Sequence, residues 1–494
     1  MATIWVNGVP QQVAVGTRLS AVLSDTPHPC SGKGVCGKCR VRAAGELSPL
    51  STAEERHLTA FEIADDVRLS CCTTIQGNCR VTVATEQPMF ICTDGARFAA
   101  TTAPAFAAFG VAVDIGTTTL AARLYDTYGH LLATAGEKNP QIAYGADVLS
   151  RVDAAGQGSD LVTPLRTAVN GLLSRLATEA DIDPFRIDGL VITGNTAMLC
   201  FFTATDPAAL ARAPFALPRA FGETLTAGEL GLTAVSPTTS VYLPPCASAF
   251  VGADALCAAL ACDVGVDGRT AMLADMGTNG EMLLYHDDVL YACSTAAGPA
   301  FEGVGISCGM PAVTGAVDEV LCVGTHMLVH VIGRAKPQGI CGSGLVDAAA
   351  CLLALEEMDG SGCIGADRVP LAAGITLTQE DIRALQQAKA AVSAGLQTLL
   401  HRADLPADGV EVLYTAGGFG SRLNGHNAAA IGLIPRDLAT RIRPVGNAAL
   451  DGAAQLLLDD SACKRITALA ANTRTIELAS DPYFADLFIE EMNF

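Results

Sequence analysis

The chain has 494 residues, a length that exceeds one ordinary hydrophobic core, so at least two domains are expected. Half of the residues are hydrophobic, yet no apolar stretch of about 18 residues runs without charge, glycine or proline, which argues against a membrane span. The formal charge of -20 disfavours nucleic acid or an anionic membrane as a partner, since either needs a basic face that displaces counterions. The N-terminus enters strand-like residues without the basic and apolar segments of a secretion signal, so a cytoplasmic location is expected.

Residues 1–92 are predicted to form a small β-rich module. Alternating strand residues at 3–6 and 12–15 flank the turn pair Asn7-Gly8, which is typical of a hairpin. After it the pattern predicts helices at 19–23 and 52–60 and strands at 40–43, 67–70 and 79–84. Residues 93–109 contain a low-complexity run of Ala, Thr, Pro and Phe and are predicted to be a linker.

Cysteine usage indicates metal binding in this module. Seven of the 18 cysteines fall in the first 92 residues, and a chain without a secretion signal favours metal ligands over a disulfide framework. Cys30, Cys36 and Cys39 are spaced Cys-x5-Cys-x2-Cys in a glycine-rich loop, and a distant cysteine follows at Cys71. Plant-type ferredoxins hold a 2Fe-2S cluster with a closely related spacing, in which the first gap is one residue shorter. A Cys-x2-Cys pair alone favours zinc, whereas three cysteines in one such loop favour the 2Fe-2S cluster.

The fourth cluster ligand is one of two neighbouring cysteines. Adjacent residues on a strand point to opposite faces, so at most one of Cys71 and Cys72 is expected to reach the cluster. We predict Cys71 as the ligand, and Cys79 and Cys92 as packing or incidental residues. The predicted ligand set is therefore Cys30, Cys36, Cys39 and Cys71.

After the predicted linker, an apolar strand followed by Asp-x-Gly-Thr occurs twice, at 111–117 and at 272–278. The second copy predicts a duplicated α/β domain with halves at 110–270 and 271–494. Apolar strands alternate with helical stretches at 161–177, 247–261, 344–355, 382–402 and 447–458. This alternation favours two α/β halves around a ligand cleft.

The two repeats carry the residues of a nucleotide site. A strand-end turn offers phosphate its N–H groups and hydroxyls, and a carboxylate beside it can hold Mg2+ through water. The first repeat supplies Asp114, Gly116, Thr117 and Thr118, and the second supplies Asp275, Gly277, Thr278, Asn279 and Glu281. A third element offers a flat surface for adenosine, formed by Gly417, Gly418 and Gly420. Each element alone is also compatible with a tight structural turn, but the three in this order predict bound ATP and Mg2+, with Asp114 and Asp275 positioning Mg2+ and water.

These elements resemble the phosphate 1, phosphate 2 and adenosine motifs of the acetate kinase, sugar kinase, Hsp70 and actin superfamily, and residues 191–196 and 339–347 resemble its connecting motifs. The resemblance implies an actin-like, RNase H-like ATPase whose C-terminal part returns to the first half. With a β-grasp, ferredoxin-like module in front, the chain resembles the reductive activators of corrinoid proteins over essentially its whole length. Residues 139–151 and the run Arg68-Leu69-Ser70-Cys71 resemble stretches typical of that family, and the second supports the choice of Cys71.

The resemblance implies an ATP-dependent reductive activase that passes one electron from the 2Fe-2S cluster to Co(II) and gives Co(I) for methyl transfer. The implied partners are a corrinoid protein of a methyltransferase system, an electron donor such as a ferredoxin or flavoprotein, and a second copy in a homodimer. No second cluster is predicted, since only Cys463 remains beyond Cys363. Three alternatives stay open: an electron activator of the 2-hydroxyacyl-CoA dehydratase type, a regulator in which cluster state gates nucleotide binding, and a metabolite kinase.

Overall fold

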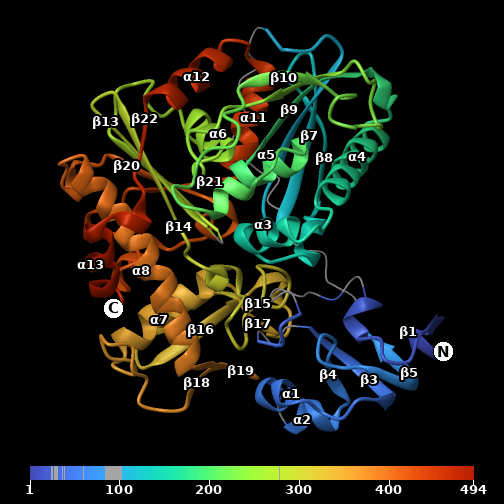
Figure 1. Ribbon diagram of the computed structural model, residues 1–494. Coiled ribbons are helices and arrows are strands. Elements are labelled where there is room, and N and C mark those ends of the chain that lie inside the picture. Colours follow the sequence, from blue (N-terminus) through green and yellow to red (C-terminus); the bar gives the residue numbers. More distant parts are fainter. Residues whose placement is uncertain are drawn as a thin grey trace. The chain divides into compact units, whose positions relative to one another are not determined.

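The computed structural model describes residues 1–23, 26, 32–35, 37, 39–58, 60–83, 103–277 and 279–494 (Figure 1). The chain divides into two compact units, one formed by Met1–Gln87 with Asn139–Pro164 and the other by Pro88–Lys138 with Leu165–Phe494. Within the described ranges, no helix combines the length and the apolar character that a membrane crossing requires.

The first unit contains a five-stranded sheet in the order β2-β1-β5-β3-β4. The central pair, β1 and β5, is parallel, and the flanking pairs are antiparallel, which is the β-grasp arrangement that the sequence predicted. Asn7 and Gly8 both have positive φ, as the predicted hairpin turn requires. The strands are β1 (Ala2–Val6), β2 (Val9–Val13), β3 (Arg40–Leu47), β4 (Val67–Leu69) and β5 (Ile75–Thr82).

The helices of the β-grasp sheet are shorter than predicted. Instead of one helix over 52–60, the chain forms α1 (Thr52–His57) and α2 (Ala60–Ala64), while η1 spans Leu19–Ala21. Helix α1 ends because Leu58 is extended, and the Leu58 side chain packs in a small buried cluster with Cys39, Leu69 and Cys71. The burial of this one leucine therefore overrides the helical pattern.

Residues 139–164 of the first unit include the stretch that resembles the corrinoid activators. It forms η2 (Pro140–Ala143) and α3 (Val148–Gly156), and Asp147 begins α3 with a capping box that includes Ser150. Arg151 is fully buried, and its Nε donates to the carbonyl of Gly145 at 2.9 Å. The buried arginine thus ties α3 to the loop before it.

The second unit contains two six-stranded sheets of the same design. The first has the order β10-β11-β9-β6-β7-β8 and the second β21-β20-β12-β13-β14-β22. In each, three antiparallel strands are followed by two parallel ones, which confirms the duplication predicted from the repeated motif. The first sheet contains β6 (Phe109–Ile115), β7 (Thr119–Asp126), β8 (Leu131–Lys138), β9 (Ile187–Gly194), β10 (Glu223–Thr226) and β11 (Ser240–Leu243). The second contains β12 (Ala271–Met276), β13 (Gly280–His286), β14 (Val289–Thr295), β20 (Val412–Ala416), β21 (Ile442–Gly446) and β22 (Thr473–Thr475).

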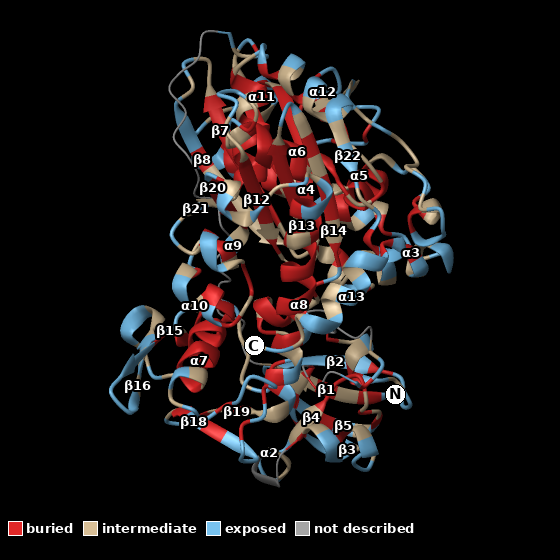
Figure 2. Ribbon diagram, turned by 90° about the vertical axis from the view of Figure 1, so that its left-hand side faces the viewer, coloured by how far each residue is buried: buried red, intermediate tan, exposed pale blue. Residues whose placement is uncertain are grey.

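Two helices lie between these sheets, α6 (Ala253–Ala261) and α11 (Ala448–Leu458) (Figure 1). They pack against each other, and α11 also packs on β6 and β9 of the first sheet. A Cβ at Gly452 of α11 would lie 1.9 Å from the carbonyl oxygen of Cys257 in α6, so only glycine allows this close crossing. Buried residues fill the sheets and these two helices, and they also line α7 (Gly342–Ala354) and α8 (Gln379–Arg402) (Figure 2).

The other elements of the second unit surround these sheets. Predicted helices at 161–177, 344–355, 382–402 and 447–458 are confirmed within a few residues, but the helix expected at 247–261 begins at Ala253. The hydroxyl of Ser248 accepts from the N–H groups of Phe250 and Val251, so residues 248–251 form a turn instead.

The remaining helices are α4 (Val162–Glu179), α5 (Thr196–Thr203), α7 (Gly342–Ala354), α8 (Gln379–Arg402), α9 (Gly417–Gly420), α10 (Gly425–Ala430), α12 (Ala462–Asn472) and α13 (Pro482–Glu490). Small sheets are formed by β15 (Ala316–Val323), β16 (His326–Val331) and β17 (Gly339–Ile340), and by β18 (Arg368–Ala372) and β19 (Ile375–Thr378).

Candidate functional site

The first Asp-x-Gly-Thr repeat forms a strand that ends in a tight hairpin turn between β6 and β7. Asp114 lies in β6, and Gly116 begins the turn, where its N–H donates to the carbonyl of Thr119 at 2.9 Å. The Thr117 hydroxyl accepts a hydrogen bond from Nδ2 of Asn195 at 2.9 Å, so this side chain is held in place. The turn leaves its predicted phosphate ligands partly exposed, namely Gly116, Thr117 and Thr118.

The second repeat likewise forms a strand that ends in a turn, between β12 and β13. Asp275 in β12 pairs with Glu281 in β13, and the Gly277 N–H donates to the carbonyl of Asn279 at 3.1 Å. Thr278, the middle residue of this turn, lies outside the described residues. The two turns thus place an aspartate, a glycine and polar turn residues at equivalent positions of the two sheets.

The predicted adenosine element lies beside the second turn. Asp275 pairs in parallel with Ala416, and the next residues form the one-turn helix α9. Gly417 has a φ of +80°, and a Cβ there would lie 2.8 Å from Oδ1 of Asp275. Gly418 is exposed and a Cβ on it would meet no atom within 4 Å, whereas Gly420 is buried. Positive φ and close approach to Asp275 therefore favour glycine at position 417, and Gly418 leaves an open face beside it.

Five carboxylates gather around these turns and perturb one another. Burial raises the pKa of Asp114 to about 7, and the charge of Asp275 adds to this effect. Burial and the charge of Asp114 raise the pKa of Asp254 to about 7, while burial and the charge of Glu302 raise that of Asp275 to about 6. The pKa of Glu281 is raised well above its usual value by burial and by the charges of Asp254 and Asp275. Such a set binds protons or cations more readily than separate carboxylates do.

Three residues of this site were not predicted from the sequence. Asp254 lies in the first turn of α6, Glu302 ends the short helix η5 (Pro299–Glu302), and Asn447 caps α11. Nδ2 of Asn447 donates to Oδ2 of Asp114 at 3.0 Å, which joins α11 to the first turn. A signal for Asp254 was present, because it is the one charged residue in the apolar sequence of α6. Neither Glu302 nor Asn447 stands in a comparable local pattern.

An aromatic contact links the glycine turn to Glu302. Phe419 of α9 stacks on Phe301 of η5, with ring centroids 4.4 Å apart and planes inclined by 11°. Phe301 directly precedes Glu302, and Phe419 directly follows the exposed Gly418. The contact therefore joins the glycine turn to the segment that carries Glu302.

The described side chains around these turns do not coordinate a metal ion by themselves. In the part of the chain that the structure describes, no three His, Cys, Asp or Glu side chains are arranged to hold a metal ion. Mg2+ does not require such an arrangement, since it keeps several waters and binds through one or two carboxylates and substrate phosphates. The carboxylates and the polar turns together suit a hydrated Mg2+ that arrives with a nucleotide.

In the first unit, two of the four predicted cluster ligands are described, and they lie together. Cys39 directly precedes β3, Cys71 follows β4 by two residues, and the antiparallel register pairs Arg40 with Leu69. This register brings Sγ of Cys39 to 3.2 Å from Sγ of Cys71, too far for a disulfide. The other two predicted ligands, Cys30 and Cys36, lie outside the described residues.

Cys71 and Cys72 do not lie on a strand, contrary to the prediction that separated them by strand geometry. Strand β4 ends at Leu69, so both cysteines lie in a turn, and their sulfur atoms are 3.6 Å apart. A turn does not alternate its side chains between two faces as a strand does. Cys71 is buried against Cys39, and Cys72 is half-buried, so the choice of Cys71 stays a prediction with a new basis.

The surroundings of these thiols suit a metal–sulfur cluster. Gly32, Gly34 and Gly37 of the cysteine loop all have positive φ, as a loop that curls tightly around a cluster requires. A Cβ at Gly34 would lie 3.0 Å from Sγ of Cys72, so the glycine lets the loop backbone approach the thiols. Neighbouring thiolates are the ligands that iron–sulfur clusters use.

The two sheets, their shared helices and the paired turns define the class of protein, an ATPase fold of the acetate and sugar kinase, Hsp70 and actin superfamily (ASKHA). Within that class, the chain belongs to the RACo family. Residues 109–266 match the RACo middle region, and residues 269–494 match the C-terminal domain of RACo, the ASKHA domain. The resemblance to corrinoid activators is therefore confirmed.

Individual relatives agree with this assignment. The chain is 34% identical over 419 residues to the corrinoid activation enzyme RamQ of Eubacterium limosum, covering 78% of this chain and 70% of RamQ. It is 25% identical over 423 residues to the [Co(II) methylated amine-specific corrinoid protein] reductase of Methanosarcina barkeri, covering 78% and 77%. A solved structure of a reductive activator for corrinoid, iron-sulfur protein superposes with a TM-score of 0.70 at 26% identity and covers 100% of this chain and 98% of its own.

Proposed function

We propose that this chain is an ATP-dependent reductive activase that passes one electron to the Co(II) of a corrinoid protein and returns it to Co(I). Membership of the RACo family carries this proposal, and its relatives are named for corrinoid activation and for reduction of a Co(II) corrinoid protein. The buried thiol pair in the first unit and the paired turns in the second supply the two kinds of site that such an enzyme needs.

The nucleotide is assigned to the second unit. Phosphate contacts are assigned to the N–H groups and side chains of the two turns, and Mg2+ to Asp114 and Asp275 through water. Raised pKa values at both aspartates support this role, since a bound cation offsets the burial and the neighbouring carboxylate charge that raise them. The proposed nucleotide contacts are Gly116, Thr117, Thr118, Gly277, Thr278, Asn279, Glu281, Gly417, Gly418 and Gly420. We add Asp254 to this proposal because its carboxylate interacts with Asp114 and Asp275.

The electron carrier is assigned to the first unit. A 2Fe-2S cluster, when bound, supplies one electron at a time at roughly -400 mV. Cys30, Cys36, Cys39 and Cys71 are its proposed ligands, and the contact between the last two supports the set. Four further points remain predictions. They are a cytoplasmic location, an electron donor such as a ferredoxin or flavoprotein, a homodimer, and the domain limits 1–92, 93–109, 110–270 and 271–494.

ATP is needed because the electron moves uphill. Each 100 mV by which the reduction potential of the acceptor lies below that of the donor costs about 2.3 kcal/mol for one electron. A conformational bias of a few kcal/mol is therefore sufficient. Closure of the two halves around ATP and Mg2+ supplies that bias if the closed state binds the corrinoid protein more tightly than the open state does.

The test separates electron entry from electron delivery with Asp275→Ala and the matched control Asp486→Ala. Asp486 is an exposed residue of α13. Cluster bleaching by a strong artificial reductant is followed first, and then Co(I) formation in a corrinoid partner with and without ATP. Asp275→Ala is expected to keep normal bleaching and to lose the ATP stimulation, because the second half loses its Mg2+ anchor.

Either of two results overturns the proposal. Full ATP-stimulated Co(I) formation by Asp275→Ala would show that nucleotide does not act through this cleft. Failure of the unmodified chain to bind iron and sulfide would show that it holds no 2Fe-2S cluster as an electron carrier.

A further inference from the structure

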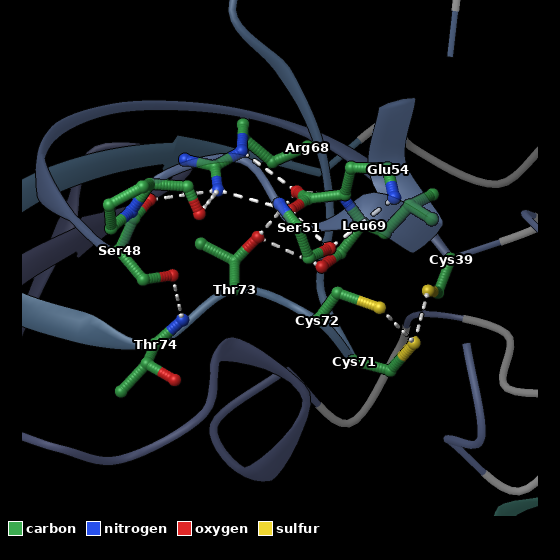
Figure 3. Close-up of polar contacts among 11 residues, drawn as sticks. Cys39, Ser48, Ser51, Glu54, Arg68, Leu69, Cys71, Cys72, Thr73 and Thr74 are labelled. Carbon is green, nitrogen blue, oxygen red and sulfur yellow. Dashed lines mark hydrogen bonds and ion pairs between the residues drawn. The ribbon is translucent and has the colours of Figure 1, made fainter. Parts of the chain in front are cut away.

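A single buried carboxylate fastens the turn that carries Cys71 and Cys72. Glu54 of α1 has no exposed surface, and its two oxygens accept hydrogen bonds from six donor positions (Figure 3). Oε1 accepts from Leu69 N–H at 3.1 Å and from the Thr73 hydroxyl at 3.0 Å. These two residues flank the cysteine turn, so one oxygen holds both of its ends.

The same carboxylate is itself held on the opposite side. Nε of Arg68 donates to Oε1 at 2.8 Å, and Nη2 donates to Oε2 at 3.2 Å. The N–H and hydroxyl of Ser51 donate to Oε2 at 2.9 and 2.8 Å as part of the capping box of α1. Both oxygens therefore face donors, and the pKa of Glu54 is lowered to about 2 by the hydrogen bonds from Arg68, Ser51 and Leu69, which outweigh the larger single effect of burial.

The held turn is also where the thiols meet. The Ser70 N–H donates to the carbonyl of Cys39 at 2.8 Å, and the Cys72 N–H donates to the carbonyl of Leu69 at 2.9 Å. The turn thus joins Cys39 through its main chain and places Sγ of Cys71 at 3.2 Å from Sγ of Cys39. A change in the attachment of Leu69 or Thr73 to Glu54 alters that sulfur–sulfur geometry.

We propose that Glu54 is a positioning residue for the cluster, because it holds the Cys71 turn so that this thiol lies beside Cys39 before iron and sulfide arrive. The inference rests on the proposed function, which places a 2Fe-2S cluster at these cysteines. Hydrogen bonds and geometry around cluster sulfurs set the reduction potential, so the Glu54 contacts tune the electron carrier as well as its assembly.

Glu54→Gln is the sharpest perturbation, because it keeps the shape of the side chain and replaces one acceptor oxygen by a donor. On the Oε1 side, the new NH2 group meets the N–H donors of Arg68 and Leu69; on the Oε2 side, it meets those of Ser51 and Arg68. Neither orientation of the amide satisfies them. Thr73→Val removes the hydroxyl that donates to Glu54, and Thr73→Ser retains that hydroxyl.

Glu55→Gln is the matched control, since Glu55 is the exposed neighbour on the same helix and takes no part in these contacts. Each full-length variant is checked for folding by circular dichroism and then reconstituted anaerobically with iron and sulfide. Iron and sulfide content, the rate of cluster assembly, the EPR spectrum of the reduced cluster and its midpoint potential are measured.

We expect Glu54→Gln and Thr73→Val to assemble the cluster about tenfold more slowly and to shift the EPR signal and the potential, because Glu54→Gln replaces a charged acceptor and Thr73→Val removes one of the donors that join Glu54 to the cysteine turn. Glu55→Gln and Thr73→Ser should match the unmodified chain. Folded Glu54→Gln and Thr73→Val proteins with unchanged assembly, EPR signal and potential would overturn the inference alone. An unmodified chain that takes up no iron and sulfide would refute the proposed function and, with it, the inference.

Discussion

Gly452 of α11 offers a test of how the halves of the ATPase unit are joined. In Gly452→Ala, the added Cβ would lie 1.9 Å from the carbonyl oxygen and 2.4 Å from the carbonyl carbon of Cys257 in α6. Contacts of Cβ atoms below 3.0 Å are essentially never found, so the two helices must separate by about 1 Å. No side-chain rotation can relieve the clash, because both contacting atoms belong to the backbone.

The expected change in the free energy of unfolding of Gly452→Ala follows from two opposing effects. Alanine favours a helix over glycine by about 1 kcal/mol, while overpacking typically costs about 1–3 kcal/mol. A gap of about 1 Å also forfeits up to half of the dispersion energy of each separated contact. We therefore expect a net destabilisation of roughly 2 kcal/mol in the second unit.

The separation also reaches the nucleotide site, because α6 carries Asp254 and α11 begins with Asn447, which donates to Asp114. We expect ATP affinity to fall along with stability. Thermal unfolding and calorimetric titration with ATP and Mg2+ measure the two effects. The control is Gly171→Ala in α4, where a Cβ meets nothing within 4 Å and should stabilise the helix. Equal stability and equal ATP affinity of the two variants would refute the reasoning.

Two further predictions concern buried charges in the second unit. Because folding raises the pKa of Asp114 from 3.8 to about 7, the folded state holds the extra proton between these values, and stability falls as pH rises through this window. In Asp114→Asn, the melting temperature should fall less between pH 5 and pH 8 than in the unmodified chain. An equal fall in both proteins would contradict the raised pKa of Asp114. Arg123 and Asp451 form a buried ion pair at 2.5 Å between β7 and α11. Arg123→Met should destabilise the chain by about 3–5 kcal/mol in urea unfolding, since it leaves Asp451 buried without its cation. The double variant Arg123→Met with Asp451→Leu should recover most of that loss, and failure to recover would show that the pair matters for more than its charges.

The paired turns could be predicted from the sequence because their information is local. An apolar strand followed by Asp-x-Gly-Thr specifies a strand end and a tight turn within seven residues, and both copies form that structure, with Asp114 in β6 and Asp275 in β12. The glycine turn at Gly417 was predictable for the same reason. Repetition of a local pattern also gave the duplicated sheets, since each copy marks the same strand in its own half.

The other residues of the candidate nucleotide site depend on contacts between distant parts of the sequence. Asn447 caps a helix that was predicted, but its bond to Asp114 joins positions 333 residues apart. Glu302 acquires its role because η5 lies beside the second turn, which no local pattern specifies. The error at Cys71 and Cys72 has a similar origin, because β4 ends at Leu69, where the N–H donates to the distant Glu54, and the local pattern of Arg68-Leu69-Ser70 does not specify that contact.

The position of α11 has a consequence for biosynthesis. The helix that covers β6 and β9 and supplies Asn447 is made 333 residues after Asp114. At about 5–20 residues per second, the ribosome needs roughly 20 to 70 seconds to supply it. During that interval the surface of β6 and β9 that α11 covers lacks this partner, and transiently exposed apolar surface of this kind aggregates readily. Early packing of α6 on this sheet shortens that exposure, and the contact of Asn447 with Asp114 forms only after α11 has left the ribosome.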